Sequence, residues 1–379
     1  MSEKIWRSSI DWLSFASACT LALLGLLTMS TFTDGDPFFI KQTAWIIIGI
    51  LVFFAASAVD WRILRRSGIA AGLYAATLVP LVALIFLGHS TQGAKSWFDI
   101  GPFALQPVEF VKLALIIALA KYFSRRHTEI HNIRHIFISG AYAAVVFVLV
   151  ALQPDFGSAL IIAGIWLGLV LISGISRWHL GVLFLVVIIA FGGLWLFGFR
   201  EYQKERILTF IHPLADIHGA GYNAYQSTVA VGSGEFWGKG IGYGSQSKLR
   251  FLPEYQTDFI FAAFAEEWGF IGICIVFGLY AVLFVRIVSI ASRGASNFET
   301  LFGFGILFYF LAHFSLHVGI NMGLLPVTGT TIPFMSYGGS HMLIEFCALG
   351  MLSGMRRYSR AAPRDAFVRE FSGGYDALR

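Results

Sequence analysis

The chain has 379 residues, of which 57% are hydrophobic and only 13% are charged, and its mean hydropathy is +0.72. An ordinary soluble protein has about 25% charged residues, so this composition excludes a water-soluble enzyme, a disordered protein and a coiled coil. The net charge of +5 does not indicate nucleic acid as a partner, because an excess of Lys and Arg in a membrane protein mostly reflects its topology.

Ten segments are apolar and long enough to cross a membrane, for which about 20 residues are needed. Because a span must satisfy its own backbone hydrogen bonds in lipid, we predict a helix for each segment. In chain order these are residues 12–31, 42–59, 68–87, 107–123, 136–152, 157–175, 180–198, 259–291, 299–320 and 341–355. We therefore expect an all-α polytopic integral membrane protein of about ten transmembrane helices, forming a single domain over residues 1–379.

The distribution of Lys and Arg predicts the orientation of these helices. One set of short loops contains most of the basic residues, whereas the opposite set contains only Lys41 and Lys95. Short loops rich in Lys and Arg remain in the cytoplasm. Both termini, including a tail at 356–379, are then cytoplasmic, and the long connection 200–257 between the seventh and eighth helices lies outside.

The long outer connection mixes glycines, aromatic residues and charges, so it is not typical of a disordered linker. We expect short surface helices within it. Its glycines at 232–244 do not form a phosphate-binding loop, because Lys239 is followed by Gly240 rather than by Ser or Thr. They are better explained as a close-packed turn structure.

Polar residues gather at the predicted outer ends of the helices. In Gln106-Pro-Val-Glu109-Phe-Val-Lys112, Pro107 is suited to the first turn of a helix. Residues three apart share a helix face, so Glu109 and Lys112 can pair as they enter the membrane. The pair is either a structural ion pair or part of a functional site, and charges inside a membrane favour function.

Asp155 precedes the sixth predicted helix, and the helix dipole alone explains an acidic residue there. Thr257 is suited to the N-cap of the eighth helix, with Asp258 in its first turn. A partly desolvated carboxylate can also act as a general base, since its pKa rises toward neutral. Asp258 and Glu254 follow the basic residues Lys248 and Arg250. Asp258 therefore either stabilises the helix start or acts as a general base, and both interpretations stay open.

The remaining ionisable residues give weaker signals. The three cysteines lie far apart in apolar runs and are expected to be small buried hydrophobes. His313 and His317 share a helix face, and we favour buried hydrogen-bonding histidines over a metal site. Glu345 is a lone carboxylate in the tenth helix, where it pairs with His317 or His341 or lines a cavity.

Nine ordered motifs carry a resemblance to the SEDS family (shape, elongation, division and sporulation). The chain resembles its elongation-type, RodA-like members more than its division-type, FtsW-like members, and the resemblance covers nearly the whole sequence. The motifs are Gly93-Ala-Lys-Ser-Trp97, Gln106-Pro-Val-Glu-Phe-Val-Lys112, Gln153-Pro-Asp-Phe-Gly157, Tyr222-Asn-Ala-Tyr-Gln-Ser227, Gly232-Ser-Gly234, Phe251-Leu-Pro-Glu-Tyr-Gln-Thr-Asp258, Glu266-Glu-Trp-Gly269, Leu325-Pro-Val-Thr-Gly329 and Pro333-Phe-Met-Ser-Tyr-Gly-Gly-Ser340.

The resemblance implies a peptidoglycan glycosyltransferase of the bacterial cytoplasmic membrane. Such an enzyme polymerises lipid II at the outer face, together with a class B penicillin-binding protein and the elongation machinery. Asp258 matches the essential aspartate of the family and is expected to be catalytic. The residues expected to bind substrate are Glu109, Lys112, Lys95, Lys248, Arg250, Glu254, Thr257, Gln106, Asp155, Ser336 and Ser340.

Two questions stay open at this stage. The sequence contains no set of residues spaced as a metal cage, so we expect no cofactor, and a divalent cation (Mg or Mn) at the diphosphate is the alternative. A lipid II flippase and a division-type polymerase are the rival functions. The flippase is less favoured, because a transporter usually binds its substrate near the membrane midplane, whereas the polar residues here gather at the outer edge.

Overall fold

The computed structural model describes residues 10–30, 37–87, 96–100, 103–125, 133–193, 195–196, 201–211, 221–249, 251–252 and 254–361. Within these residues, ten helices correspond one to one to the ten predicted spans. They are α2 (Trp12–Ser30), α3 (Pro37–Ala58), α4 (Ser67–Leu87), α5 (Pro107–Ser124), α6 (Ile133–Leu152), α7 (Phe156–Ile172), α8 (Arg177–Gly193), α12 (Ile260–Ala291), α13 (Asn297–Asn321) and α14 (Gly339–Ala361). The last helix continues to Ala361, so the first residues of the expected tail, 356–361, are helical.

Six of these helices are apolar and long enough to cross a membrane, namely α2, α3, α4, α6, α12 and α13, and α7 and α8 are shorter apolar helices. Helices α5 and α14 contain charged residues within their length. The chain is thus a mainly helical polytopic membrane protein, in which α5 and α14 each combine apolar residues with a few charged ones.

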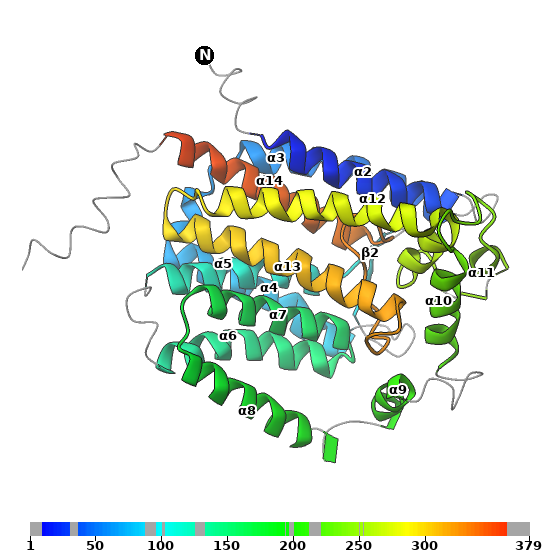
Figure 1. The fold of residues 1–379 in the computed structure, drawn as a ribbon. Coiled ribbons are helices and arrows are strands. Elements are labelled where there is room, and N and C mark those ends of the chain that lie inside the picture. The colour runs from blue at the N-terminus through cyan, green and yellow to red at the C-terminus, as the bar shows by residue number, and fades with distance from the viewer. Residues whose placement is uncertain are drawn as a thin grey trace, which may run out of the picture.

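The helices lie side by side as a bundle (Figure 1). Helix α14 packs along α3, and α13 packs against α5, α7 and α12. Helix α5 is buried along most of its length, because its own side chains are apolar on nearly every face. The start of α2 and the end of α14 lie at the same end of the bundle, where Arg356 Nη1 lies 2.9 Å from Asp11 Oδ1.

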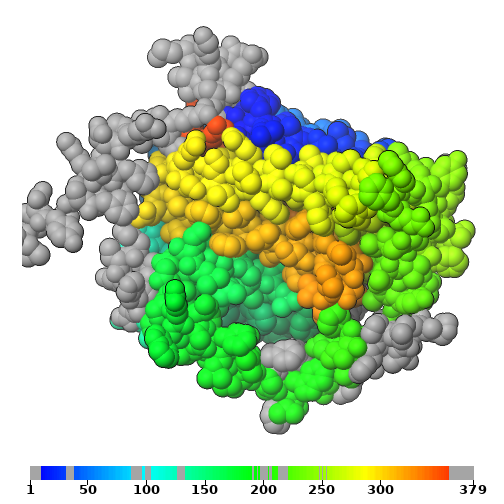
Figure 2. Space-filling model, viewed as in Figure 1, coloured from blue at the N-terminus to red at the C-terminus, as the bar shows by residue number. Residues whose placement is uncertain are grey.

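The outer faces of the bundle are apolar. One face of the molecule shows α12 and α13 as yellow and orange bands, with the long connection 200–257, named the outer connection after its predicted side, at one end of them (Figure 2). Large exposed hydrophobic residues occur along the helices, including Phe86, Phe184 and Val285. This pattern is typical of side chains that face lipid.

Helix α12 contains a kink at Gly269, whose φ is +64° and ψ is −163°. The kink explains why a single apolar segment spans 32 residues, which is longer than a straight span requires. The backbone groups freed at the kink are bonded by the outer connection, since Phe270 N donates to Glu235 O at 2.9 Å and Lys239 N donates to Glu266 O at 3.0 Å.

The outer connection contains the helices α9 (Glu201–Ile211), α10 (Tyr222–Ser233) and α11 (Ser245–Lys248), as the sequence predicted. Helix α10 packs against α12 and α13. Two elements were not predicted from the sequence. They are the short 3-10 helix η1 (Trp61–Arg65) and an antiparallel hairpin of β1 (Phe98–Ile100) and β2 (Phe103–Leu105), which leads directly into α5.

Candidate active site

The bundle encloses the ion pair that the sequence predicted. Glu109 and Lys112 lie one turn apart on α5, and Lys112 Nζ is 2.7 Å from Glu109 Oε1. The exposed fractions of the two residues are 3% and 0%, so protein surrounds the pair. Charged side chains at such depth need further hydrogen-bond partners, which α13 and α14 provide.

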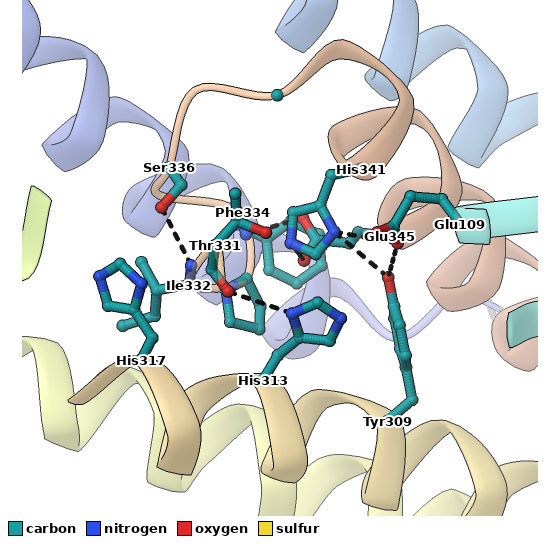
Figure 3. A network of polar contacts seen from close by, with 12 residues as sticks. Glu109, Tyr309, His313, His317, Thr331, Ile332, Phe334, Ser336, His341 and Glu345 are labelled. Carbon is teal, nitrogen blue, oxygen red and sulfur yellow. Dashed lines mark hydrogen bonds and ion pairs between the residues drawn. The ribbon is translucent and has the colours of Figure 1, made fainter. Parts of the chain in front are cut away.

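The second carboxylate oxygen of Glu109 has two such partners (Figure 3). Tyr309 of α13 donates its hydroxyl to Glu109 Oε2 at 3.1 Å, and His341 Nδ1 of α14 lies 3.2 Å from the same oxygen. Both partners come from helices far from α5 in the sequence. Glu109 therefore joins α5, α13 and α14 at one point.

The two histidines of α13 bond backbone carbonyl groups. His313 Nδ1 lies 3.1 Å from Thr331 O, and its Nε2 lies 3.2 Å from Lys112 Nζ. An ammonium group can only donate, so His313 Nε2 accepts and Nδ1 carries the proton. His317 Nδ1 lies 2.6 Å from Thr330 O. The prediction of buried hydrogen-bonding histidines is confirmed.

Glu345 extends the same cluster on α14. Its Oε1 lies 2.8 Å from His341 Nε2, one turn away. Its Oε2 accepts a hydrogen bond from the backbone N–H of Phe334 at 2.8 Å. Of the partners that the sequence left open for Glu345, the structure selects His341. Tyr309 and His341 were not among the predicted site residues, although His341 was a candidate partner of Glu345 and Tyr309 lies one turn before His313 on α13.

A second group of polar residues precedes α12, and here one prediction is wrong. Helix α12 begins at Ile260 with Phe259 at its N-cap and no side-chain cap, so Thr257 is not the N-cap and Asp258 lies before the first turn. The backbone oxygen of Glu254 accepts from the N–H groups of residues 257–259, which forms a tight turn there. The capping acceptor comes instead from α13, because Ala262 N donates to Asn321 Oδ1 at 3.0 Å.

Asp258 is half-buried on this turn. Its backbone oxygen accepts from Asn321 Nδ2 at 2.9 Å. Gly329 adopts a φ of +71°, and a Cβ there would stand 3.4 Å from Asp258 Oδ2, so the chain passes directly beside the carboxylate. Glu254, by contrast, is exposed, and its Oε2 accepts from Thr257 Oγ1 at 3.3 Å.

The segment 330–337 connects the two groups. Ser336 Oγ donates to Thr257 O at 2.8 Å and accepts from Ile332 N at 2.9 Å. Tyr337 N donates to Gln256 O at 2.8 Å. The segment that bonds His313 and Glu345 at one end therefore also holds the backbone before Asp258.

Gln106, Asp155 and Ser340 meet at the start of α5. Gln106 Nε2 donates to Asp155 Oδ2 at 3.2 Å, and Gln106 N donates to Ser340 Oγ at 2.9 Å. Asp155 is also the N-cap of α7, since its Oδ1 accepts from Ser158 N at 3.0 Å. Removal from water raises the pKa of Asp155 above its ordinary value, and Lys112 and Ser158 oppose this shift without cancelling it.

The structure places only two of the four predicted cations, Lys248 and Lys112. Lys95 and Arg250 lie outside the described residues. Lys248 is exposed on α11, and its Nζ lies 3.5 Å from Gly242 O. Lys112 is enclosed with Glu109. Within the described residues, no interaction of Lys248 or Lys112 with the Asp258 carboxylate is resolved.

The other two carboxylates near the start of α12 bind the outer connection. Glu266 accepts from Lys239 Nζ at 2.6 Å and from Gln246 N at 3.1 Å, and Glu267 Oε1 accepts from Gly242 N at 2.7 Å. The expected close-packed glycine turn is confirmed, because a Cβ on Gly238 would lie 2.1 Å from Glu267 O. These carboxylates hold the connection rather than extend the group around Asp258.

One set of side chains could hold a metal ion by distance. Ligand atoms of Glu109, His313 and His341 all lie within 4.8 Å of one another. The ammonium of Lys112 already lies between Glu109 and His313, at 2.7 and 3.2 Å. A positive charge thus fills this position without a metal, so the donor set does not fit an additional divalent cation.

Comparison with known proteins identifies the family. The profile of the FtsW/RodA/SpoVE family, described as cell cycle protein, matches residues 10–361. The chain belongs to this family. It is 33% identical over 320 residues to the peptidoglycan glycosyltransferase MrdB of Escherichia coli K12, covering 84% of this chain and 86% of the relative. It is 34% identical over 382 residues to a probable peptidoglycan glycosyltransferase FtsW of Halothiobacillus neapolitanus, covering 95% and 89%.

Solved structures of the same family share the fold. A chain of a peptidoglycan synthase complex, described as coordinating polymerization and crosslinking, superimposes with a TM-score of 0.78 at 28% identity, covering 93% of this chain and 99% of that chain. The rod shape determining protein RodA of Thermus thermophilus gives a TM-score of 0.69 at 26% identity, covering 92% and 97%. The expected membership and the polytopic fold are thus confirmed.

Proposed function

We propose that this chain polymerises lipid II into glycan strands, with Asp258 as the general base. The enzyme class, a peptidoglycan glycosyltransferase, follows from the family, since relatives of both the elongation and the division type bear that name. The observation that carries the proposal is the setting of Asp258. Its carboxylate is half-buried beside Gly329, and hydrogen bonds from Asn321, Ser336 and Tyr337 hold the backbone at and just before it.

In the proposed reaction the acceptor 4-hydroxyl oxygen attacks the anomeric carbon of the donor. The bond between that carbon and the diphosphate oxygen breaks, and polyprenyl diphosphate leaves with the electron pair. Asp258 takes the proton of the hydroxyl group. A single carboxylate suffices because the diphosphate is a good leaving group, and direct displacement inverts the anomeric centre.

The proposed substrate contacts divide by their accessibility. Lys248 and Glu254 are exposed in the structure, so they can meet the head group directly. The proposed contact of Lys112 with the diphosphate requires the enclosed cluster to open. Lys95 and Arg250 complete the proposed cations. Thr257, Gln106, Asp155, Ser336 and Ser340 are proposed to shape the site around Asp258 rather than to react.

We place both termini in the cytoplasm and the site at the outer face of the bacterial cytoplasmic membrane. The uneven distribution of Lys and Arg supports this orientation, and so does the position of both described chain ends at one end of the bundle. The chain is proposed to act as a single domain, 1–379, in elongation, with a class B penicillin-binding protein as its partner. The complex that contains the similar solved chain supports such a partnership.

The test is lipid II polymerisation by the purified chain with its cognate penicillin-binding protein, whose transpeptidase is blocked. Wild type and Asp258→Asn are compared, and thermal unfolding in detergent checks that both are folded. We expect polymer from the wild type and none from the variant. Equal polymer from both would refute Asp258 as the base. Transport of lipid II into reconstituted vesicles without polymer would instead support the flippase.

A further inference from the structure

Glu345 is an enclosed carboxylate that the proposed reaction does not use. Its exposed fraction is 0%. One oxygen lies 2.8 Å from His341 Nε2, and the other accepts from the backbone N–H of Phe334 at 2.8 Å. A buried carboxylate destabilises a protein unless it is paired. These two contacts provide the pairing, and they join Glu345 to His341 and to the backbone of Phe334.

The charges around Glu345 balance. His341 has a carboxylate oxygen at each ring nitrogen, Glu109 at Nδ1 and Glu345 at Nε2. A neutral imidazole has one N–H group, whereas the doubly protonated ring can face both carboxylates. In that state the charges of Glu109 and Glu345 balance those of Lys112 and His341.

The contact of Glu345 with Phe334 falls on an unusual part of the backbone. Phe334 has a φ of +63°, a region that residues other than glycine rarely adopt. Its side chain is fully buried and packs on Phe310 and Phe346. The turn is thus held by the aromatic packing of Phe334 and by its backbone contact with Glu345, which lies beside it in Figure 3.

The turn at Phe334 leads directly to the bonds that hold the Asp258 segment. Two residues later, Ser336 Oγ donates to Thr257 O, and Tyr337 N then donates to Gln256 O, both at 2.8 Å. The Glu345 contact at Phe334 is therefore only two to three residues away from these bonds. A change in the turn would therefore move both donors relative to Asp258.

We propose that Glu345 is a positioning residue, which fixes Asp258 through the turn at Phe334 and through the donors of Ser336 and Tyr337. His341 contacts the other carboxylate oxygen of Glu345 and carries the opposite charge when both of its ring nitrogens are protonated. The inference rests on the proposed function, because the position of Asp258 matters for rate only if Asp258 acts in the transfer.

Two substitutions separate the hydrogen bond of Glu345 from its charge. In Glu345→Gln the amide can still accept from Phe334 N–H and donate to a neutral His341, so we expect the turn to persist. Glu345→Leu removes the acceptor. The matched control is Glu299→Leu, because Glu299 is also a buried carboxylate, 3% exposed and paired with Arg65 at 2.7 Å, but it lies at the opposite end of α13 from Asn321.

The first readout is hydrogen–deuterium exchange of peptides that cover residues 254–262 and 329–337, measured by mass spectrometry in detergent. We expect Glu345→Leu to raise exchange in both peptides by about tenfold, the size expected for the loss of one hydrogen bond to a charged group. Glu345→Gln and Glu299→Leu should keep wild-type exchange there. Unchanged exchange in Glu345→Leu would overturn the inference.

The second readout is lipid II polymerisation by the same variants. We expect Glu345→Leu to lower kcat by about tenfold with KM unchanged, and Glu345→Gln and Glu299→Leu to keep kcat. If kcat is kept in Glu345→Leu while exchange rises, Glu345 is structural and the inference fails. If the wild type makes no polymer but the exchange result holds, the proposed function fails and the link between Glu345 and the Asp258 segment stands.

Discussion

Asn321, the last residue of α13, donates its side-chain Nδ2 to the backbone oxygen of Asp258 at 2.9 Å. The same amide accepts from Ala262 N through Oδ1 at 3.0 Å. One buried side chain thus caps the start of α12 and holds the residue that we propose as the base. The segment before α12 depends on α13 for its position, even though 63 residues separate Asp258 from Asn321.

We predict that Asn321→Leu destabilises the protein by about 1–3 kcal/mol, because it leaves the buried Ala262 N–H without an acceptor. Asn321→Asp keeps an acceptor for that N–H but loses the donor to Asp258. Thermal unfolding in detergent should therefore show the larger effect in Asn321→Leu, whereas polymerisation should fall in both. Full activity in a folded Asn321→Asp would contradict the role of the donor.

A second prediction concerns Glu109 and Lys112. Removing one partner of a buried ion pair leaves an uncompensated charge and costs about 3–5 kcal/mol. We expect Glu109→Gln and Lys112→Met each to show such a loss, measured as unfolding free energy in detergent. The double variant should lose less than the sum of the two. Additive effects would mean that the two side chains are not coupled, despite their 2.7 Å contact.

A third prediction tests the kink of α12. A Cβ on Gly269 would lie 2.2 Å from Gly238 N, and the φ of Gly269 is +64°. Gly269→Ala should therefore lower the free energy of unfolding by about 1–3 kcal/mol or more, the cost of a strained backbone residue. It should also detach the outer connection from α12. The matched control is Gly232→Ala in α10, where a Cβ meets nothing within 4 Å. That variant should be neutral or about 0.5–1 kcal/mol more stable.

Limited proteolysis of the outer connection provides the measurement for this prediction. Faster cleavage in Gly269→Ala than in Gly232→Ala and the wild type is expected. Equal cleavage in all three would show that the close approach of Gly238 to Gly269 does not hold the connection in place.

Much of the fold could be predicted from the sequence, because helices in lipid must be long and apolar. All ten predicted spans are helices, and the pairing of Glu109 with Lys112 follows from their spacing of three. The N-cap of α12 was predicted wrongly, since Thr257 has the local features of an N-cap. The actual acceptor, Asn321, is distant in the sequence, and local patterns carry no information about it.

The buried cluster could not be predicted for the same reason. Glu109, Tyr309 and His341 come from three helices whose contacts depend on how the bundle packs. The role of Glu345 depends on the backbone at Phe334, and nothing in the sequence around Phe334 indicates a positive φ for this residue. Which residues are polar is evident in the sequence, but which of them meet is decided by the packing of α5, α13 and α14.

The last prediction concerns Asp11, just before α2. Its carboxylate pairs with Arg286 of α12 and Arg356 of α14. Burial alone would raise the pKa of Asp11, but hydrogen bonds and the charges of the two arginines hold it below the ordinary value of 3.8. A carboxylate whose pKa is lowered by folding stabilises the protein above its unfolded pKa, and this contribution is lost as the pH falls through the folded pKa.

We therefore expect Asp11→Asn to cost about 1.5–3 kcal/mol near neutral pH, the value for hydrogen bonds to charged groups. The difference from the wild type should be constant between about pH 5 and 7 and should shrink below about pH 4, where Asp11 of the unfolded chain takes up a proton before Asp11 of the folded protein does. Unfolding midpoints in detergent across this range provide the measurement. The control is Asp60→Asn, because Asp60 pairs with Arg62 at an exposed site and should change stability by less than about 1 kcal/mol at every pH. A difference between Asp11→Asn and the wild type that does not vary down to pH 3 would show that the Asp11 carboxylate does not contribute through its charge.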